Sequence, residues 1–486
     1  MRLKIILCLA VLSLAFGRME LAAQEEEKVA WTLSDCINHA YDNNLTIQQI
    51  QLNMELANKD YAQSKWNMLP GITGQANQNF DFANSLDPTT FTFVPANSNS
   101  TTFSLNANLV LFAGLTQMNL AKLNRANLDA SIFDVETARQ DAALAIANFF
   151  LQVLSFKESL EIAEKQVEII EDQLDQSREL VNAGVIPEGN LLELEAQLAN
   201  AELTVIQSEN NRDLSTLSLK LALQIDPLAE FDIVEPPTEF DPLSLDLYML
   251  EEVMDYALEN QPSVKASMMR SQVAEAQIRV NRGSFSPTFS FNFNMRSNYF
   301  SLAQTRVGET SPIYPTIGFV NTTGDEVISA VPVTTPIFEK TNFGEQLGNT
   351  FNQSVNFSVN VPIFSRWQKM TNLQKSKIQL EQSELDLEST QNSVRESVAR
   401  AHADAEAASK TYTASQKNAK AQTNAYEFAQ EKYNLGAINA LELNTTRNNY
   451  LIAESNLINA KYDYIFKRLI LDVYKGRDIR TIKANP

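Results

Sequence analysis

Side chains that could carry acid-base, nucleophilic or metal chemistry are few and widely separated in this 486-residue sequence. The two histidines, His39 and His402, stand far apart. His402-Ala403-Asp404 falls inside a long helical pattern, where a solvated helix face explains it better than a metal site. The sequence contains neither a Gly-rich phosphate loop nor a Ser-His-Asp arrangement with a supporting context. These observations predict a protein that is not an enzyme and that has no catalytic residue, metal or cofactor.

The first 23 residues have the pattern of a secretory signal peptide. Arg2 and Lys4 precede an apolar core over residues 5–16, and small residues close the segment at Ala22-Ala23. Removal of residues 1–23 leaves Cys36 as the only thiol, so no internal disulfide can form. Because Cys36 falls in an apolar helical pattern, we expect it to be a small core residue.

The charge balance is strongly acidic. The formal net charge is −20, and residues 1–23 contain three basic residues and one acidic residue, a net of +2, so their removal leaves −22. Nucleic-acid binding needs a basic surface and is not expected. The acidity suits a wall that passes cations or repels anions, and an exposed acidic face explains it equally well.

Two very long stretches lack both glycine and proline. They cover residues 115–183 and 366–435, which are 69 and 70 positions long, and a glycine follows each at Gly184 and Gly436. A helix of that length would extend about 100 Å, far beyond an ordinary globular helix. Apolar residues recur at spacings of three and four, which predicts coiled-coil-like packing along the helix.

The chain is a tandem duplication. Gly184 corresponds to Gly436 at an offset of 252 residues, whereas segments upstream of the strands correspond at an offset of 217, so the second copy has a 35-residue insertion. We therefore divide the chain into a signal peptide (1–23), a first repeat (24–240) and a second repeat (241–486). Return helices are expected at 188–226 and 437–475, each about half as long as the helix before it.

Four segments alternate between apolar and polar residues, as do strands with one apolar face and one solvated face. They are expected at about 71–83, 102–112, 288–299 and 353–363, and no window after residue 23 has 18 consecutive apolar residues, so no transmembrane helix is predicted. Residues 300–350, rich in Gly, Pro, Thr and Asn, are expected to form a long extracellular loop. Prolines mark the expected junctions of helix and strand, namely Pro70, Pro287 and Pro362.

Four strands cannot close a barrel, and lipid does not tolerate open strand edges. Three copies would supply twelve strands and leave a lumen. The predicted fold is therefore mainly α with a membrane β-barrel: duplicated long helical hairpins and four transmembrane strands per chain, completed as a trimer. The alternative interpretation of the strands is the edge of a soluble β-sandwich or a small amphipathic sheet.

The duplicated helix-strand-strand-helix plan resembles that of the TolC-like outer-membrane efflux and secretion channels over nearly all of the chain after residue 23. Short motifs that carry the resemblance are Gly436-Ala437-Ile438, Leu441-Glu442-Leu443 and Ala460-Lys461-Tyr462-Asp463-Tyr464. The resemblance implies an outer-membrane exit duct of a tripartite efflux or type I secretion system in a Gram-negative bacterium. It implies as partners a homotrimer, outer-membrane lipid, a periplasmic membrane-fusion adaptor and, through the adaptor, an inner-membrane pump of RND or ABC type. The competing hypothesis is a secreted or surface structural helical protein without channel activity.

The resemblance also implies two functional regions at the turns that end the long helices. Glu442 matches an acidic residue that constricts the periplasmic entrance in such channels, although an exposed helix acid is nearly as good an explanation. The adaptor would dock on the two helical tips, whose residues are Asn182, Gly184, Val185, Ile186, Asn434, Gly436, Ala437 and Ile438.

Overall fold

The structure is a computed structural model that describes residues 30–86, 91–234 and 247–481. The segment predicted as a signal peptide lies outside these residues, and so do residues 235–246, which include the expected boundary between the repeats at 240 and 241.

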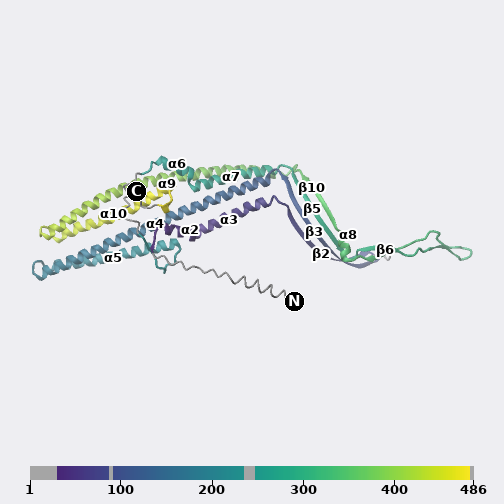
Figure 1. The fold of residues 1–486 in the computed structure, drawn as a ribbon, viewed down its shortest axis with the longest axis horizontal. Coiled ribbons are helices and arrows are strands. Elements are labelled where there is room, and N and C mark those ends of the chain that lie inside the picture. Colours follow the sequence, from purple (N-terminus) through teal and green to yellow (C-terminus); the bar gives the residue numbers. More distant parts are fainter. Residues whose placement is uncertain (1–29, 87–90, 235–246, 482–486) are drawn as a thin grey trace, which may run out of the picture. The chain divides into compact units, whose positions relative to one another are not determined.

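Long helices and one antiparallel sheet dominate the described residues (Figure 1). The helices are α2 (Leu33–Asn43), α3 (Leu45–Trp66), α4 (Thr116–Asn182), α5 (Glu188–Leu223), α6 (Leu250–Asn260), α7 (Pro262–Gly283), α8 (Phe343–Asn349), α9 (Gln368–Asn434), α10 (Ala440–Tyr474) and the 3-10 turn η2 (Ile479–Thr481). The strands are β1 (Ala30–Trp31), β2 (Gly71–Leu86), β3 (Phe93–Ala113), β4 (Asp232–Ile233), β5 (Thr288–Phe300), β6 (Gln304–Glu309), β7 (Thr316–Phe319), β8 (Glu326–Ile328), β9 (Pro336–Lys340) and β10 (Asn352–Asn360).

The two predicted long helices are present as α4 and α9, each of 67 residues. α5 runs back along α4, and α10 runs back along α9 (Figure 1). Among the described helices, α4 alone contains an 18-residue stretch that is apolar enough to cross a membrane. Half of that stretch is buried inside the protein, as in the core helix of a protein that does not span a membrane with helices.

The described chain divides into two compact units, and each unit contains segments of both repeats. One unit takes the chain up to Leu56, Asp129–Met269 and the chain from Glu384 onward, and the other takes Ala57–Leu128 and Arg270–Ser383. The two sequence repeats are therefore not two separately packed domains, because segments of both repeats contribute to each unit.

The first unit has a dense apolar core around the middle of the long helices. Ile37 of α2, Leu154 of α4 and Leu219 of α5 are at most 1% exposed and belong to one cluster. Cys36 is fully buried in the same cluster, as expected for a small core residue. A second cluster joins α6, α7, α9 and α10, with Val398 and Leu471 at its centre. The two clusters therefore pack the long helices against their neighbours in this unit.

The second unit contains the four-stranded antiparallel sheet, in the order β10-β5-β3-β2 (Figure 1). β10 and β2 are its edges, and each has a partner strand on one side only. β3 begins at Phe93, earlier than the expected residue 102, because its residues 93–108 pair with the whole of β2. β10 ends at Asn360, earlier than the expected residue 363, because Pro362 cannot donate a ladder hydrogen bond.

The segment predicted as a loop at 300–350 contains four short strands and a short helix. β6 pairs with β9, β7 pairs with β8, and α8 returns the chain to β10. Sequence reading missed this hairpin because Gly308, Pro312, Pro315 and Pro332 interrupt its alternation.

The corners from strand to helix are alike in the two repeats. Gly114 and Leu115 have φ angles of 61° and 62°, and Arg366 and Trp367, at the same offset of 252 residues, have 51° and 66°. Two consecutive left-handed residues therefore turn each strand into its long helix. Pro70 directly precedes β2, Pro287 directly precedes β5, and Pro362 follows β10 before this corner; that the prolines impose the changes of direction stays a prediction.

Candidate functional site

The tip of each long helix is built by the same hydrogen-bonded turn. At the first tip the N–H of Val185 donates to Leu180 O and that of Gly184 to Val181 O, both at 2.9 Å. At the second tip Ala437 donates to Lys432 O at 2.8 Å and Gly436 to Tyr433 O at 2.9 Å. This is a Schellman motif, in which the glycine takes a positive φ, here 71° and 70°.

The predicted docking residues are mostly uncovered. Asn182, Gly184, Val185, Gly436 and Ala437 are exposed. Ile186 and Ile438 are half-buried, and Ile438 packs on a small cluster of Tyr426, Ala429 and Leu443. The backbone of Asn434 ends α9, and its side chain lies outside the described ones. A β-carbon on either glycine would meet nothing within 4 Å, so backbone conformation alone explains these two residues.

Glu442 is exposed in the first turn of α10. Its N–H donates to the Asn439 side chain at 2.9 Å, which caps the helix. At the corresponding turn Pro187 is the N-cap of α5. Prolines are most common one position later, at the first residue of a helix. A carboxylate at a helix N-terminus is favoured by the helix dipole whatever its other role.

Arg447 joins the two helical hairpins behind the tips, and the sequence did not single it out. Its side chain is 6% exposed. Nη1 donates to Gln173 of α4 at 3.1 Å, and Nη2 donates to Gln197 of α5. Burial lowers the pKa of Arg447, and burial also raises the pKa of Tyr426 beside it. A polar pattern on a surface helix gives no signal that one arginine turns inward.

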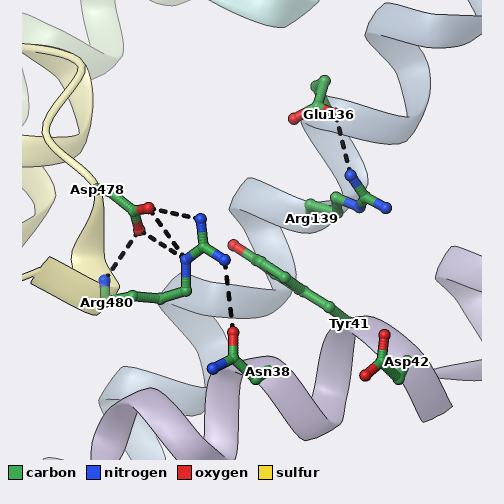
Figure 2. Close-up of a pocket in the computed structure, with 7 residues that line it drawn as sticks. All are labelled: Asn38, Tyr41, Asp42, Glu136, Arg139, Asp478 and Arg480. Atoms are coloured by element: carbon green, nitrogen blue, oxygen red, sulfur yellow. Dashed lines mark hydrogen bonds and ion pairs between the residues drawn. The ribbon is translucent and has the colours of Figure 1, made fainter.

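A polar cavity of about 450 Å³ lies in the first unit, where the end of the chain meets α2 and α4 (Figure 2). The Tyr41 ring lies between two guanidinium groups, with Arg480 at 5.6 Å and Arg139 at 5.8 Å from its centroid. Burial raises the pKa of Tyr41. The remaining lining residues are Asn38, Asp42, Glu136 and Asp478.

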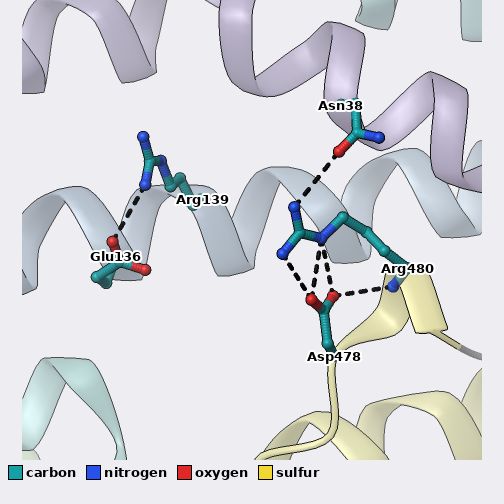
Figure 3. Close-up of polar contacts among 5 residues, drawn as sticks. All are labelled: Asn38, Glu136, Arg139, Asp478 and Arg480. Atoms are coloured by element: carbon teal, nitrogen blue, oxygen red, sulfur yellow. Dashed lines mark hydrogen bonds and ion pairs between the residues drawn. The ribbon is translucent and has the colours of Figure 1, made fainter.

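The charges of this cavity pair with one another. Arg480 contacts Asp478 at 2.6 Å and Asn38 at 3.4 Å, while Arg139 contacts Glu136 at 3.2 Å (Figure 3). The hydrogen bond from Arg480 lowers the pKa of Asp478 below its ordinary value of 3.8. The pair therefore stabilises the fold above that value and loses its effect as the pH falls through the lowered pKa. Among the described residues no group of His, Cys, Asp and Glu could hold a metal ion. We call the contact of Arg480 with Asp478 and with Asn38 of α2 the clasp.

The sheet separates apolar from polar side chains row by row. Phe291 stands opposite Leu109 on one side and Phe357 on the other, with the two phenylalanine rings 5.3 Å apart. The next row is polar, with Asn292 opposite both Asn108 and Asn356. Because side chains alternate along a strand, the registers place the four apolar patterns on one face and the four polar patterns on the other.

Neutral amides dominate the polar face. The Asn108 side chain donates to Asn292 at 2.6 Å, and Asn294 donates to Asn106 in the neighbouring row. Asp81 and Arg296 are the only charged residues in the four strands of this described sheet, and their registers place both with the polar rows. The other face carries no charge, so it can lie against an apolar medium.

Long antiparallel helical hairpins joined to an incomplete, two-faced β-sheet define a class of protein: the outer-membrane channel with a helical extension. The family model described as "Outer membrane efflux protein" matches residues 36–223 and 253–476. The chain belongs to this family of TolC-like channels. It is an outer-membrane protein, mainly helical with a curled half-barrel sheet, and its family is not enzymatic.

Individual relatives are distant in sequence and close in fold. The outer membrane efflux protein BepC of Brucella suis biovar 1 (strain 1330) is 19% identical over 453 residues, covering 92% of this chain and 85% of its own. The CmeC outer membrane channel of Campylobacter jejuni has a TM-score of 0.68 at 17% identity, covering 91% of this chain and 85% of its own. VceC of Vibrio cholerae has a TM-score of 0.68 at 12% identity, with coverages of 92% and 96%.

Proposed function

We propose that three copies of this chain form a passive exit duct across the outer membrane. Substrates would enter from a periplasmic adaptor, which receives them from an inner-membrane pump of RND or ABC type, and would leave to the exterior without any bond being made. The free edges of the sheet carry the proposal, because β10 and β2 each leave a row of backbone groups unpaired. In lipid such rows require a partner strand, and a second copy supplies one.

Uncovered leucines on the helices support the same assembly. On α5 they follow one helical stripe, and each is more than a third exposed: Leu192, Leu203, Ile206, Leu214, Leu217 and Leu221. On α3, Leu45, Leu52 and Leu56 are 61–65% exposed. Stripes at such spacing are typical of helices that pack on other helices. Neighbouring copies would cover them and continue the barrel as a helical tube.

In this proposal the tips bind the adaptor, and Glu442 selects among ions at the gate. Each tip presents a rigid turn with exposed small and apolar residues, which suits a helical partner such as a membrane-fusion adaptor. Glu442 of three copies would form an acidic ring at the narrow end. An acidic ring favours cations and binds multivalent cations more strongly than monovalent ones.

The oligomeric state tests the proposal first. We expect the full-length protein, purified in detergent from the outer-membrane fraction, to run as an SDS-resistant trimer that becomes a monomer on boiling. The same preparation should give discrete conductance steps in planar bilayers. A detergent-independent, extended monomer without conductance would contradict the proposal and favour the surface structural protein.

The gate is tested by Glu442→Gln in the same bilayers. We expect weaker preference for cations and weaker block by multivalent cations, because the substitution removes three carboxylates from one ring while keeping side-chain size. Glu188→Gln is the matched control, since Glu188 is an exposed acid in the first turn of α5. An unchanged Glu442→Gln record would reject the gate role and leave the duct standing.

A further inference from the structure

The hairpin that leaves the sheet carries an unusual amount of uncovered apolar surface. We call residues Gln304–Lys340 the ribbon; it consists of β6, β7, β8 and β9, with a bridge between Ile313 and Val333. Its strands form two separate two-stranded sheets, β6 with β9 and β7 with β8, so no further strand covers either face of these sheets (Figure 1). Twelve of its large apolar side chains are 38–70% exposed: Val307, Ile313, Tyr314, Ile317, Phe319, Val320, Val327, Ile328, Val331, Val333, Ile337 and Phe338.

This surface is as large on each face as a functional patch. At about 150 Å² for a large side chain, twelve half-exposed side chains present roughly 900 Å² of apolar surface, or about 450 Å² on each of the two faces. The largest apolar patch on a typical monomer is about 300–600 Å² and is often functional. An isolated two-stranded hairpin is also only marginally stable in water. Both arguments indicate that another surface covers the ribbon in the assembled protein.

The segment that follows the ribbon is fixed to the sheet by polar contacts of one buried and one exposed side chain. Gln346, which is 4% exposed, accepts from Phe300 N–H and donates to Thr341 O, both at 2.9 Å. Thr350 accepts from the N–H of Asn298 at 2.8 Å and donates to its carbonyl at 2.7 Å. These contacts tie that segment to β5, the direct neighbour of the edge strand β10. The ribbon therefore starts one strand away from the edge that a second copy must pair.

We propose that the ribbon is a contact between copies, in which the ribbon of one chain packs its apolar side chains on the ribbon of the next. The inference rests on the proposed closed assembly and goes beyond it. Equivalent points on neighbouring copies would be four strands apart, or about 20 Å along the wall, whereas one arm of the ribbon is roughly 50 Å long. Each ribbon is thus long enough to span the distance to its neighbour.

The charges of the ribbon favour a like apolar surface over a charged partner. Residues 311–324 and 327–338 contain no charged side chain. Arg306 pairs with Glu309 near the base, and Glu326 accepts from the Thr316 hydroxyl at 3.1 Å. Such a surface offers nothing specific to an anionic headgroup or an acidic peptide. It matches an identical copy, which needs no complementary charge.

Substitutions at the outer part of the ribbon test the proposal in the intact protein. One variant carries Ile317→Ser, Phe319→Ser and Ile328→Ser, three positions that are 60–67% exposed and contribute little to folding of the single chain. The matched control carries Ile317→Val, Phe319→Leu and Ile328→Val, which keep the surface apolar. We expect the serine variant, and not the control, to dissociate from SDS-resistant trimer to monomer at a temperature several degrees lower. Hydrogen exchange of ribbon amides should become about tenfold faster in the serine trimer.

The outcomes separate this proposal from the proposed function. If the unmodified protein is not an oligomer, the duct itself is wrong. If it is a trimer and both variants match it in dissociation temperature and ribbon exchange, the duct stands and the ribbon contact is overturned. Protection of the ribbon that depends on added lipid vesicles and is equal in monomer and trimer would assign the surface to lipid, and that also overturns the contact.

Discussion

At the scale of single residues, Arg447 shows what burial adds to a polar side chain. It is almost fully buried, and it donates to side-chain amides on two other helices, Gln173 and Gln197. Taking a guanidinium out of water is costly, so the amides that receive its hydrogen bonds must be well placed. The residue therefore fixes the distance between the hairpins just behind the tips.

We predict that Arg447→Met loosens both tips. The apolar chain fits the space but leaves the half-buried amide oxygens of Gln173 and Gln197 without this donor, which costs about 1 kcal/mol each. Hydrogen exchange of tip amides in residues 180–186 and 433–442 should accelerate by roughly tenfold to a hundredfold. Arg178→Met is the control, because Arg178 is half exposed and pairs only with Asp175 three residues earlier. Equal exchange in the two variants would contradict the role of Arg447.

Sequence reasoning at this scale found residues whose role is conformational and missed those whose role depends on neighbours. Gly184 and Gly436 were identifiable because each ends a long run without glycine, and a left-handed turn favours that residue. Arg447 and the clasp of Arg480 with Asp478 were not identifiable, since their partners are hundreds of positions away or hidden in an acidic background. Periodicity reports which face of a helix is apolar, and it does not report a polar residue inserted into that face.

At the scale of elements, two glycines with similar backbone angles have different surroundings. Gly114, with φ of 61°, would place a β-carbon 2.6 Å from Ser286 Cβ and closer still to the Gly283 carbonyl. Gly184, with φ of 71°, would place it in open space. The first glycine serves both a left-handed turn and a close approach of two segments, whereas the second serves only the turn.

We therefore predict that Gly114→Ala destabilises far more than Gly184→Ala. A non-glycine residue in the left-handed region costs about 1 kcal/mol, and this is the whole expected effect at Gly184. At Gly114 overlap with backbone atoms should raise the loss to roughly 3 kcal/mol or more. Midpoints of denaturant unfolding in the same detergent measure the difference. Similar midpoints would show that the corner shifts to make room.

The elements themselves were largely predictable from the sequence, and their ends were less so. The absence of glycine and proline defined α4 and α9 to within a few residues of their observed ends. Alternation found the middle of all four strands of the sheet. It missed the first part of β3, where the polar residues 97–100 lie before the expected start of the strand and are held by pairing with β2. Pairing with β2 determines the strand conformation of those residues, and the pattern of a single sequence does not show which strands pair.

At the scale of the whole molecule, adjacent residues on β5 give a direct test of the two faces. Phe291 belongs to an apolar row and Asn292 to a polar row. We predict that Phe291→Asp prevents SDS-resistant trimers from accumulating in the outer membrane, because a charge on the lipid face costs on the order of 2 kcal/mol per copy. Asn292→Asp should leave trimers intact and increase the cation preference in planar bilayers. The reverse pattern would mean that the faces are assigned the wrong way round.

The duplication explains why the order of helices and strands was largely predictable from the sequence. Each half repeats one sequence of elements, and the left-handed corner occurs at the same offset in both, although Gly114 has become Arg366 in the second half. Backbone geometry has thus been retained where the residue type has not. The ribbon is the exception, since it lies in the insertion of the second copy and its pattern predicted a loop where the structure has strands.

The unpaired edges of the sheet also govern how copies can come together. Any open row of sheets, whether of one, two or more copies, keeps one bare β10 and one bare β2. Adding a copy merely moves an exposed edge outward, and both edges vanish only in the step that closes the ring. Ring closure is therefore strongly cooperative, and pairs of chains have no special stability on the way to it. Newly exported chains face the same hazard of mispairing until that last step is complete.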